Sequence, residues 1–371
     1  MRVCQLTTVH GPFDDRIFFK QCVSLAAAGH EVIELAPAEH ATTEQGVRIQ
    51  PLNIPVQRVL RMLVGGWRAY RATKALRPDV VHFHDPELLP VGFLLKWRGI
   101  RVVYDMHELV QRQILDKTWL GPGSLRKTMA AVYGRIERAA VSRFDAIVLA
   151  ESRYTDELFP RYPRHLDKFT LVRNFPVLSV IDRHHATVAK GEGLTVIYVG
   201  GLSEARGIGA LINAVDRVPG ARLWLLGSWA SPEFQASCEA RSGFARTTWF
   251  GQLRMDEVYA YIRAADLGAC VLHPLPNYVV SEPIKTYEYL ACGIPLLLSD
   301  FPLWRDRFGP WSWFVDPLDE NSIVAAIRIA QEDASGRTEK ARSGRIVVEE
   351  ERCWERESAR LIDLYRKLEA R

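Results

Sequence analysis

Residues Ser281 to Pro295 read SEPIKTYEYLACGIP, and this stretch decides the fold that we predict. Proline is pre-organised for the first turn of a helix, so we expect the helix to begin at Pro283 with Glu282 as its cap. Gly293 then ends the helix, and the apolar run from Ile294 to Ser299 has the length and composition of a buried strand. A helix followed by a buried strand is a unit of a parallel α/β sheet.

The start of this helix has the features of an anion site. The amides of Ile284, Lys285 and Thr286 lie in the first turn, where backbone donors have no partner within the helix. Together with the helix dipole and the Lys285 ammonium they would bind phosphate. Glu288 lies on the same face, about one turn further on, and its carboxylate could accept hydrogen bonds from both hydroxyls of a ribose. The sequence thus indicates a nucleotide site, with an ordinary amphipathic surface helix as the alternative.

Length and composition are those of a soluble globular protein. The 371 residues predict about two domains, and 48% apolar with 25% charged residues is ordinary for a protein with a sizeable core. The six cysteines are scattered without a CxxC pair, which favours core thiols in a reduced, cytoplasmic setting. The N-terminus lacks a signal-peptide pattern, and no uncharged apolar stretch reaches the ~18 residues of a membrane span.

Charge is divided unevenly between the two halves. Residues 1–175 hold 25 Lys and Arg against 18 Asp and Glu, a balance of +7, and residues 176–371 hold 23 against 26, a balance of −3. Residues 45–78 contain no acidic side chain, and seven basic ones alternate there with apolar residues: Arg48, Arg58, Arg61, Arg68, Arg71, Lys74 and Arg77. This segment could lie on an anionic membrane surface, or form a solvated helix face with snorkelling arginines. Nucleic acid is disfavoured because no recognised binding motif surrounds these residues.

Short apolar runs alternate with helical patterns along the whole chain, which predicts parallel sheets with helices on both faces. In the first half we expect strands at 3–9, 32–36, 80–84, 102–106, 146–150 and 170–173, with helices near 14–28, 86–98, 123–142 and 152–159. In the second half we expect strands at 195–199, 222–226, 248–250, 267–272 and 294–299, and helices at 207–216, 256–265 and 354–368. The predicted organisation is a domain at 1–173, a linker at 174–193, a second α/β domain at 194–350 and a closing helix at 351–371.

Three predicted strands of the first half are followed by a histidine. His10 precedes Gly11, His84 follows the third strand, and His107 precedes Glu108. Since ligands of open parallel sheets bind beyond the carboxyl ends of the strands, these side chains should meet in one polar crevice. A metal site is the less favoured alternative, because the segment around His84 offers no cysteine or further ligand at a metal-binding spacing.

The second half carries a glycine turn between a strand and a helix, residues 198–209, YVGGLSEARGIG. Gly200 and Gly201 would let the backbone approach a ligand, and Arg206 offers a planar fork for phosphate. The turn is neither a GxGxxG fingerprint nor a P-loop, and a purely structural turn is the alternative. No D-x-D triplet occurs in the chain, which disfavours a metal-bound diphosphate.

Five motifs in order resemble the retaining GT-B glycosyltransferases of family four: HDPELL at 84–89, YDMHE at 104–108, VRNFP at 172–176, YVGGLSEARGI at 198–208 and SEPIKTYEYLACGIP at 281–295. The resemblance covers nearly the whole chain. It implies an α/β fold of GT-B type, with two Rossmann-like domains facing a central cleft. It also implies that the first domain binds the acceptor, that the second binds the nucleotide sugar, and that the final helix crosses back to the first.

By position in these motifs, Arg206 and Lys285 match the basic pyrophosphate residues, Glu288 the ribose-binding glutamate and His107 the histidine beside the reacting sugar. The resemblance makes His107, Arg206 and Lys285 the catalytic candidates. Further donor contacts would come from Gly200, Gly201, Glu282, Ile284 and Thr286, and acceptor contacts from His10, Gly11, His84 and Glu108. No metal and no cofactor are implied.

Two positions depart from the family pattern. Family members often carry a second glutamate where Val280 stands here, two residues before Glu282. The arginine that commonly follows the first glycine of the loop is replaced by Gly201. The site residues therefore indicate a nucleotide better than they indicate a particular sugar.

The function implied is transfer of a hexose, with retention, from a UDP- or GDP-sugar to a hydroxyl of a glycan or lipid-linked acceptor. Synthesis of bacterial surface polysaccharide or glycolipid, at the inner face of the membrane, would suit the basic first half. The alternatives are a nucleotide-sugar epimerase and a non-catalytic subunit that binds sugar nucleotides.

Overall fold

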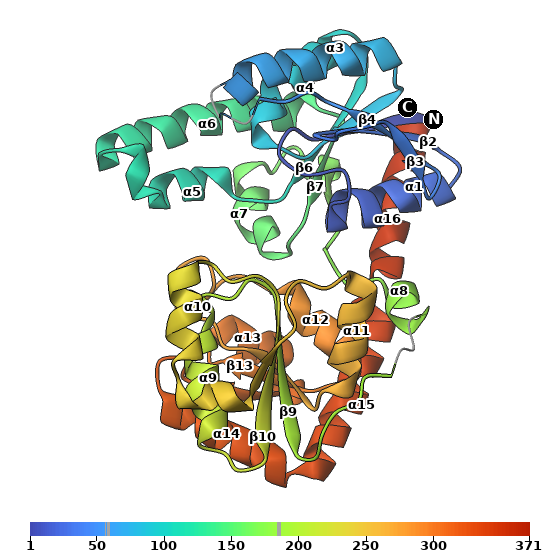
Figure 1. Cartoon of the computed structure of the whole chain (residues 1–371). Coiled ribbons are helices and arrows are strands. Elements are labelled where there is room, and N and C mark those ends of the chain that lie inside the picture. The colour runs from blue at the N-terminus through green and yellow to red at the C-terminus, as the bar shows by residue number, and fades with distance from the viewer. Residues whose placement is uncertain (56, 58–59, 184–186) are drawn as a thin grey trace. The chain divides into compact units, whose positions relative to one another are not determined.

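The computed structural model describes residues 1–55, 57, 60–183 and 187–371. It divides into two compact units: Met1–Asn174 together with Trp354–Arg371, and Phe175–Cys353 (Figure 1). Arg58 of the basic segment and residues 184–186 of the expected linker lie outside the described residues. No described helix combines the length and the apolar character that crossing a membrane requires.

The first unit is built on a sheet with the strand order β3-β4-β2-β1-β5-β6-β7-β8. Neighbouring strands are parallel except for the β3–β4 pair. The chain moves outward from β1 to one side and then returns to pair β5 on the other, so the topological switch point lies between β1 and β5. The strands are β1 Arg2–Leu6, β2 Glu31–Ala36, β3 Thr42–Glu44, β4 Val47–Pro51, β5 Val80–Phe83, β6 Arg101–Met106, β7 Ala146–Leu149 and β8 Phe169–Leu171.

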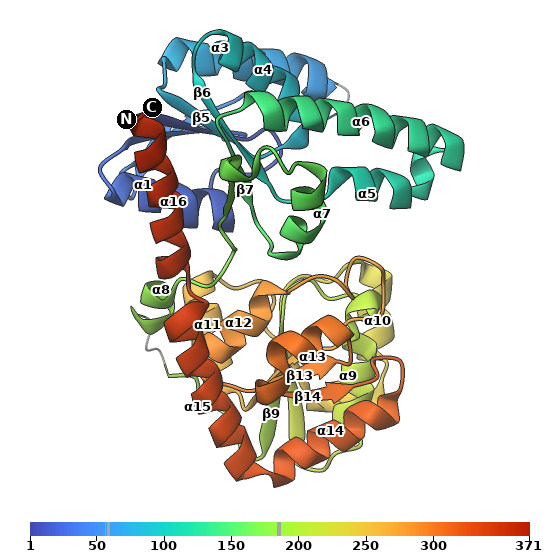
Figure 2. The same ribbon diagram turned by 180° about the vertical axis from the view of Figure 1, so that it is seen from behind.

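Helices cover both faces of this sheet. Figures 1 and 2 show α3 (Gly66–Leu76) and α4 (Leu89–Trp97) over one face, and α1 (Val23–Ala27) and α16 (Trp354–Glu369) against the other. The remaining helical segments are η1 Asp15–Cys22, η2 Arg61–Gly65, η3 Pro86–Leu88, α5 Val110–Asp116, η4 Thr118–Leu120, α6 Gly123–Arg143, α7 Arg153–Arg161 and η5 Leu166–Lys168. Aromatic and aliphatic side chains such as Phe83, Tyr104 and Phe144 fill the core on one face.

The last helix belongs to the first unit although it follows the second in sequence. The Trp354 indole donates to the Ser24 hydroxyl at 2.8 Å. Glu357, which is fully buried, accepts from the Arg173 guanidinium at 2.8 Å. α16 thus completes one face of the first sheet.

The second unit has an all-parallel sheet of order β11-β10-β9-β12-β13-β14, with its switch point between β9 and β12. Its strands are β9 Leu194–Val199, β10 Ala221–Leu226, β11 Thr247–Trp249, β12 Leu267–Cys270, β13 Leu296–Ser299 and β14 Ser312–Val315. Its helices are α8 Leu178–Arg183, η6 Glu204–Arg206, α9 Ile208–Asp216, α10 Pro232–Glu239, η7 Ser242–Arg246, α11 Met255–Ala264, α12 Ile284–Ala291, α13 Pro302–Phe308, η8 Gly309–Trp311, α14 Glu320–Glu332 and α15 Ala334–Glu351.

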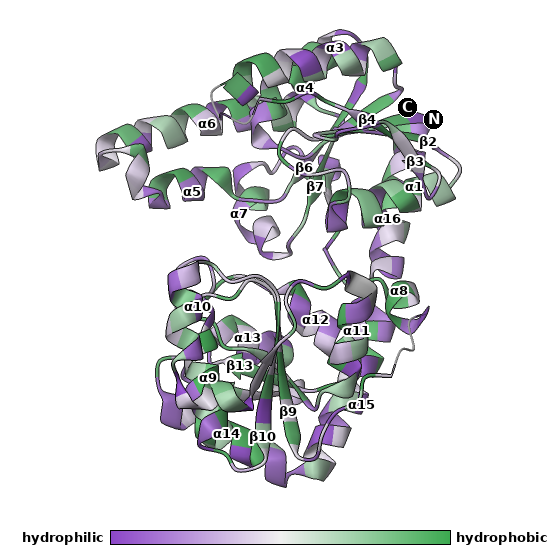
Figure 3. Cartoon of the chain, viewed as in Figure 1, coloured by the Kyte–Doolittle hydropathy of each residue, from purple (hydrophilic) through white to green (hydrophobic). Residues whose placement is uncertain are grey.

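The central strands β9, β10, β12 and β13 are almost entirely buried, and Figure 3 shows the hydrophobic residues of β9 in green. One core packs against α9 and α14 and includes Val196 and Leu225. The other packs against α11 and α12 and includes Ile197, Trp224 and Tyr289. Continuous apolar runs of this kind are typical of parallel sheets covered on both sides.

The parallel α/β architecture expected from the sequence is the one observed, with differences in detail. β1 ends at Leu6 rather than at residue 9, because Thr7 and Thr8 turn to bond the Asp85 carboxylate. The segment expected to be a linker contains α8, whose Ile181 is fully buried. Helix α15 was not predicted, because only Gly344 and Val348 are buried there and the apolar period is therefore weak. Other elements that were not predicted include β3, β4, β14, α10, α13 and α14.

Candidate active site

The glycine turn after β9 lies at the carboxyl end of the second sheet. Gly200 has φ +125° and Gly227, which follows β10, has φ +139°. A Cβ on Gly227 would lie 2.0 Å from the carbonyl oxygen of Gly200, so a side chain there is excluded. The close approach of these two turns needs glycine at 227.

A pocket of about 310 Å³ opens beside this turn. Backbone of Gly200, Gly201 and Gly227 forms part of its wall, and the other lining residues are Val199, Leu226, Ser228, Gln252, Leu253 and Val258. A small, largely apolar pocket with exposed backbone at the carboxyl ends of parallel strands is the usual place for a ligand of an α/β sheet.

Arg206 and Lys285 meet above the glycine turn. The Lys285 ammonium donates to the Tyr198 hydroxyl at 2.9 Å and lies 4.1 Å from the centre of its ring. The Arg206 guanidinium lies 3.5 Å from the same hydroxyl, which in turn donates to the Gly201 carbonyl at 3.2 Å. A Cβ on Gly200 would come within 2.9 Å of the Lys285 nitrogen, so the turn leaves room for both cations.

Neither cation has a carboxylate partner among the described residues. The tyrosine holds them in place without neutralising them. Two adjacent cations beside a glycine turn at the ends of β-strands are groups that could bind an anion with more than one phosphate.

The start of α12 differs from the prediction. The helix begins at Ile284, and Pro283, in extended conformation, occupies the cap position. The Thr286 amide donates to the Pro283 carbonyl at 3.1 Å, so it does not face a ligand. Glu282 is not a cap, because its carboxylate accepts from the Tyr287 hydroxyl at 2.5 Å and lies 3.4 Å from Arg307. The predicted cap is therefore wrong, and the Thr286 amide already has a partner within the chain.

Glu288 follows Lys285 by one turn on α12 and is half-buried. Its carboxylate accepts from the Tyr259 hydroxyl at 3.3 Å, which fixes the side chain against α11. The position of Glu288 and its bond with a hydroxyl are compatible with the prediction that its carboxylate accepts hydrogen bonds from the hydroxyls of a ribose.

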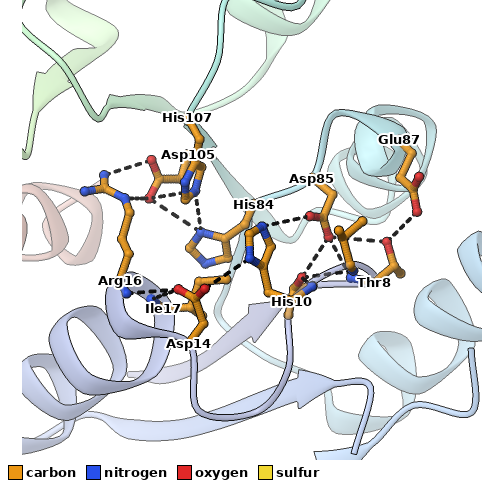
Figure 4. A network of polar contacts seen from close by, with 12 residues as sticks. Thr8, His10, Asp14, Arg16, Ile17, His84, Asp85, Glu87, Asp105 and His107 are labelled. Carbon is orange, nitrogen blue, oxygen red and sulfur yellow. Dashed lines mark hydrogen bonds and ion pairs between the residues drawn. The ribbon is translucent and has the colours of Figure 1, made fainter. Parts of the chain in front are cut away.

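In the first unit, the residues that follow β1, β5 and β6 lie together near the switch point (Figure 4). His84 Nδ1 is 3.1 Å from His107 Nε2, and the rings of His10 and His107 stack with their centres 6.0 Å apart. His84 is buried, whereas His10 and His107 keep 37% and 21% of their side chains exposed and can reach a ligand. Of the other predicted residues, Gly11 and Glu108 are exposed, and no hydrogen bond joins either to these rings among the described residues.

The buried carboxylate of Asp105 contacts two of these histidines and an arginine. Arg16 donates to both of its oxygens, at 3.0 and 2.9 Å, and Gln21 donates to one of them. His84 and His107 each place a nitrogen 3.5 Å from the same oxygen. Burial would raise the pKa of the Asp105 carboxyl, but the Arg16 guanidinium outweighs it and holds the pKa well below its usual range.

The pKa values of His10 and His107 are shifted in opposite directions. Burial lowers the pKa of His107 to about 3, so this ring is neutral at physiological pH. The hydrogen bond with Asp14, at 3.1 Å, raises the pKa of His10 despite partial burial, with Asp85 acting in the same direction. Neighbouring groups with divergent proton affinity are typical of sites that position polar substrates.

The ligand atoms of His84, Asp105 and His107 lie within 4.8 Å of one another, which is a spacing that a metal ion could use. Both oxygens of Asp105 are, however, engaged by the Arg16 guanidinium, whose charge would oppose a cation. The donor set fits an internal ion pair rather than a metal centre.

Sequence reasoning missed several residues of these sites. Asp105 stands in the motif that contains His107, but its partner Arg16 is 89 positions away and carries no local signal. Asp85 stands in the HDPELL motif, which assigns it no role, and its carboxylate accepts from the Thr7 hydroxyl and the Thr8 amide. The sequence does carry a signal for Tyr198, because a polar aromatic residue near the end of a strand, two residues before Gly200, is placed to reach the glycine turn.

Family models match both units. Residues 17–174 match the glycosyl transferase 4-like domain, and residues 181–345 match glycosyl transferases group 1. No curated protein is close enough in sequence to count as a relative.

Solved structures share the fold at low sequence identity. Sucrose-phosphate synthase from Thermosynechococcus elongatus is 19% identical, with a TM-score of 0.74 over 100% of this chain and 99% of its own. HepE of Anabaena in complex with UDP and glucose is 15% identical, with a TM-score of 0.69 and 98% of each chain covered. A trehalose-phosphate synthase from Burkholderia xenovorans in complex with glucose-6-phosphate is 12% identical, with a TM-score of 0.70 over 99% of this chain and 100% of its own. Both Rossmann-like units, each matched by its own glycosyltransferase model, place this chain among the group 1 glycosyltransferases of GT-B fold.

Proposed function

We propose that this glycosyltransferase moves a hexose, with retention, from a UDP- or GDP-sugar to a hydroxyl of a glycan or lipid-linked acceptor. The second unit would hold the donor and the first would hold the acceptor. The observation that carries the proposal is the pair Arg206 and Lys285, which Tyr198 holds beside the glycine turn without a neutralising carboxylate among the described residues.

Charge development explains why such a pair serves this reaction. As the glycosidic bond breaks, negative charge grows on the departing diphosphate, and fixed cations stabilise it most where it develops. Arg206 and Lys285 would supply this stabilisation directly. Glu288 would bind the ribose, and the pocket beside Gly201 would receive another part of the nucleotide sugar.

His107 would orient a sugar hydroxyl rather than remove a proton as a strong base. Its low pKa makes it neutral, so it offers a hydrogen bond at no cost in charge burial. In a retaining reaction on one face of the sugar, the leaving phosphate itself can take the proton of the acceptor hydroxyl. His10 and Glu108 would contribute polar contacts to the acceptor.

The structural relatives make UDP the first nucleotide to test. HepE of Anabaena was solved with UDP and with UDP-glucose, and the trehalose-phosphate synthase from Burkholderia xenovorans is a UDP-forming enzyme solved with glucose-6-phosphate.

We also propose that the first unit contacts the anionic inner face of a membrane, where surface polysaccharide or glycolipid would be made. Leu63 and Trp67 of the basic segment are 70% and 57% exposed. Arg68, Arg71 and Lys74 are exposed within the same short stretch. Apolar side chains surrounded by basic ones suit an anionic lipid surface.

Nucleotide binding tests the core of the proposal. Isothermal titration with UDP and GDP should show binding that Lys285→Ala or Arg206→Ala weakens at least tenfold, since each removes one charged partner of the diphosphate. Arg342→Ala, which removes an exposed cation of the same unit, should bind as the wild type does. Equal affinity in all the variants would overturn the assignment of the diphosphate site.

Kinetics and product analysis test the remainder. Glu288→Ala should raise the donor KM more than it lowers kcat, because the ribose contact is made before and during transfer. Proton NMR of the product should show the anomeric configuration of the donor sugar. An inverted product would contradict retention, and a donor isomer formed without any acceptor would favour an epimerase.

A further inference from the structure

A continuous set of polar side chains links the last helix of the chain to His107. His107 Nε2 lies 3.1 Å from His84 Nδ1, and His84 Nε2 lies 2.7 Å from Gln5 Oε1. The other end of the Gln5 amide, Nε2, lies 3.4 Å from His82 Nδ1, which also lies 3.0 Å from the Tyr365 hydroxyl. Tyr365 belongs to α16, and it and the three residues between it and His107 are 0–2% exposed.

The chemistry of these atoms fixes where the protons lie. An amide oxygen can only accept, so His84 Nε2 must carry the hydrogen that bonds to Gln5. In the tautomer with its hydrogen on Nε2, His84 has a bare Nδ1, which accepts the hydrogen of His107 Nε2. His107 is therefore the Nε2–H tautomer, and its remaining nitrogen, Nδ1, carries a lone pair that can accept a hydroxyl hydrogen.

The orientation of the Gln5 amide decides this outcome. If the amide turned over, its NH₂ group would face His84 Nε2, which would have to give up its hydrogen and carry it on Nδ1 instead. His107 would then accept at Nε2 and present N–H at Nδ1. In the orientation that the structure has, the Gln5 NH₂ group faces His82 Nδ1 at 3.4 Å, and that nitrogen also lies 3.0 Å from the Tyr365 hydroxyl, which can donate to it.

We propose that Tyr365 and Gln5 are positioning residues that set the tautomer of His107, so that Nδ1 accepts a hydrogen bond from a substrate hydroxyl. The role in transfer rests on the proposed function. The tautomer does not, because it is a property of the free protein.

The test is nitrogen NMR of the protein with ¹⁵N-labelled histidine, in which long-range spectra distinguish the two neutral tautomers. His107→Asn identifies the signals of His107. The wild type should show His107 in the Nε2–H form. Tyr365→Phe, which removes one oxygen, and Gln5→Met, which removes the amide, should shift a measurable fraction to the Nδ1–H form.

Tyr162→Phe provides the matched control. It removes a tyrosine hydroxyl of the same unit that bonds to Glu137 and not to this set, so the His107 signals should stay as in the wild type. Wild-type tautomer in folded Tyr365→Phe and Gln5→Met would overturn the proposal, and thermal unfolding of each variant establishes that it is folded.

Activity gives a separate readout. Tyr365→Phe should lower kcat several-fold with the UDP affinity unchanged, because the diphosphate site lies in the other unit. A shifted tautomer with unchanged kcat would show that Tyr365 sets the tautomer of His107 but would overturn the role of that tautomer in transfer. Failure to bind UDP in the wild type would instead contradict the proposed function and leave the NMR result standing.

Discussion

At the scale of single residues, Glu34 on β2 has a measurable effect on stability. The side chain is fully buried, and neither of its oxygens has a hydrogen-bond partner among the described residues. Burial raises the pKa of this carboxyl from its usual 4.5 to about 8. The folded state therefore holds a proton that the unfolded state releases, and stability is lost as the pH rises from about 4.5 to about 8.

Glu34→Gln removes this dependence without changing the shape of the side chain. At pH 8 the variant should exceed the wild type in free energy of unfolding by more than about 1 kcal/mol, since each unit of pKa corresponds to about 1.4 kcal/mol. At pH 5 the two proteins should be alike. Urea unfolding at both values measures the difference, and Glu31→Gln, an exposed position of the same strand, should show no such trend. A constant difference at both values would rule out this titration.

At the scale of elements, α16 is held to the first sheet by a buried ion pair. Glu357 accepts from the Arg173 side chain at 2.8 Å and from its amide at 2.8 Å, with Arg360 at 3.3 Å. Removal of Glu357 leaves the partly exposed Arg173 side chain and the Arg173 amide without their acceptor, which costs about 1–3 kcal/mol. Glu357→Ala should lower the free energy of unfolding of the first unit by that amount in urea, measured by tryptophan fluorescence.

Asp363→Ala on the same helix is the comparison. Its partner Lys367 is 2.7 Å away, but both side chains are more than half exposed, so the loss should stay below about 1 kcal/mol. Equal losses in the two variants would mean that helix propensity, rather than the buried pair, determines how firmly α16 docks.

Elements were easier to predict than the partners of their side chains. The strand Leu296–Ser299 and helix α12 follow from local periodicity and from Gly293, which ends the helix with φ +75°. The contact of Lys285 with Tyr198 and of Tyr365 with His82 joins positions 87 and 283 residues apart. No local pattern encodes such distances. The cap of α12 was mispredicted for the same reason, because Tyr287 and Arg307 compete for Glu282.

At the scale of the whole molecule, the unequal charge of the two halves predicts where an anionic surface binds. Vesicles of phosphatidylglycerol and phosphatidylcholine should sediment the protein at low salt and release it as the ionic strength rises. Leu63→Ser with Trp67→Ser should weaken sedimentation several-fold, since both side chains are largely exposed in the basic segment. Ile329→Ser, an exposed position of the second unit, should have no effect. Unchanged binding of the double variant would contradict contact through this segment.

The position of α16 also has a consequence for how the protein is made. The second unit, Phe175–Cys353, is encoded between the two parts of the first. A ribosome therefore releases all of the second unit before it releases the residues that cover the underside of the first sheet. During synthesis the groups around His82 and Ser24 therefore stay uncovered until α16 leaves the ribosome. A chain that stops early by eighteen residues would keep a complete second unit and an incomplete first one, with that face uncovered.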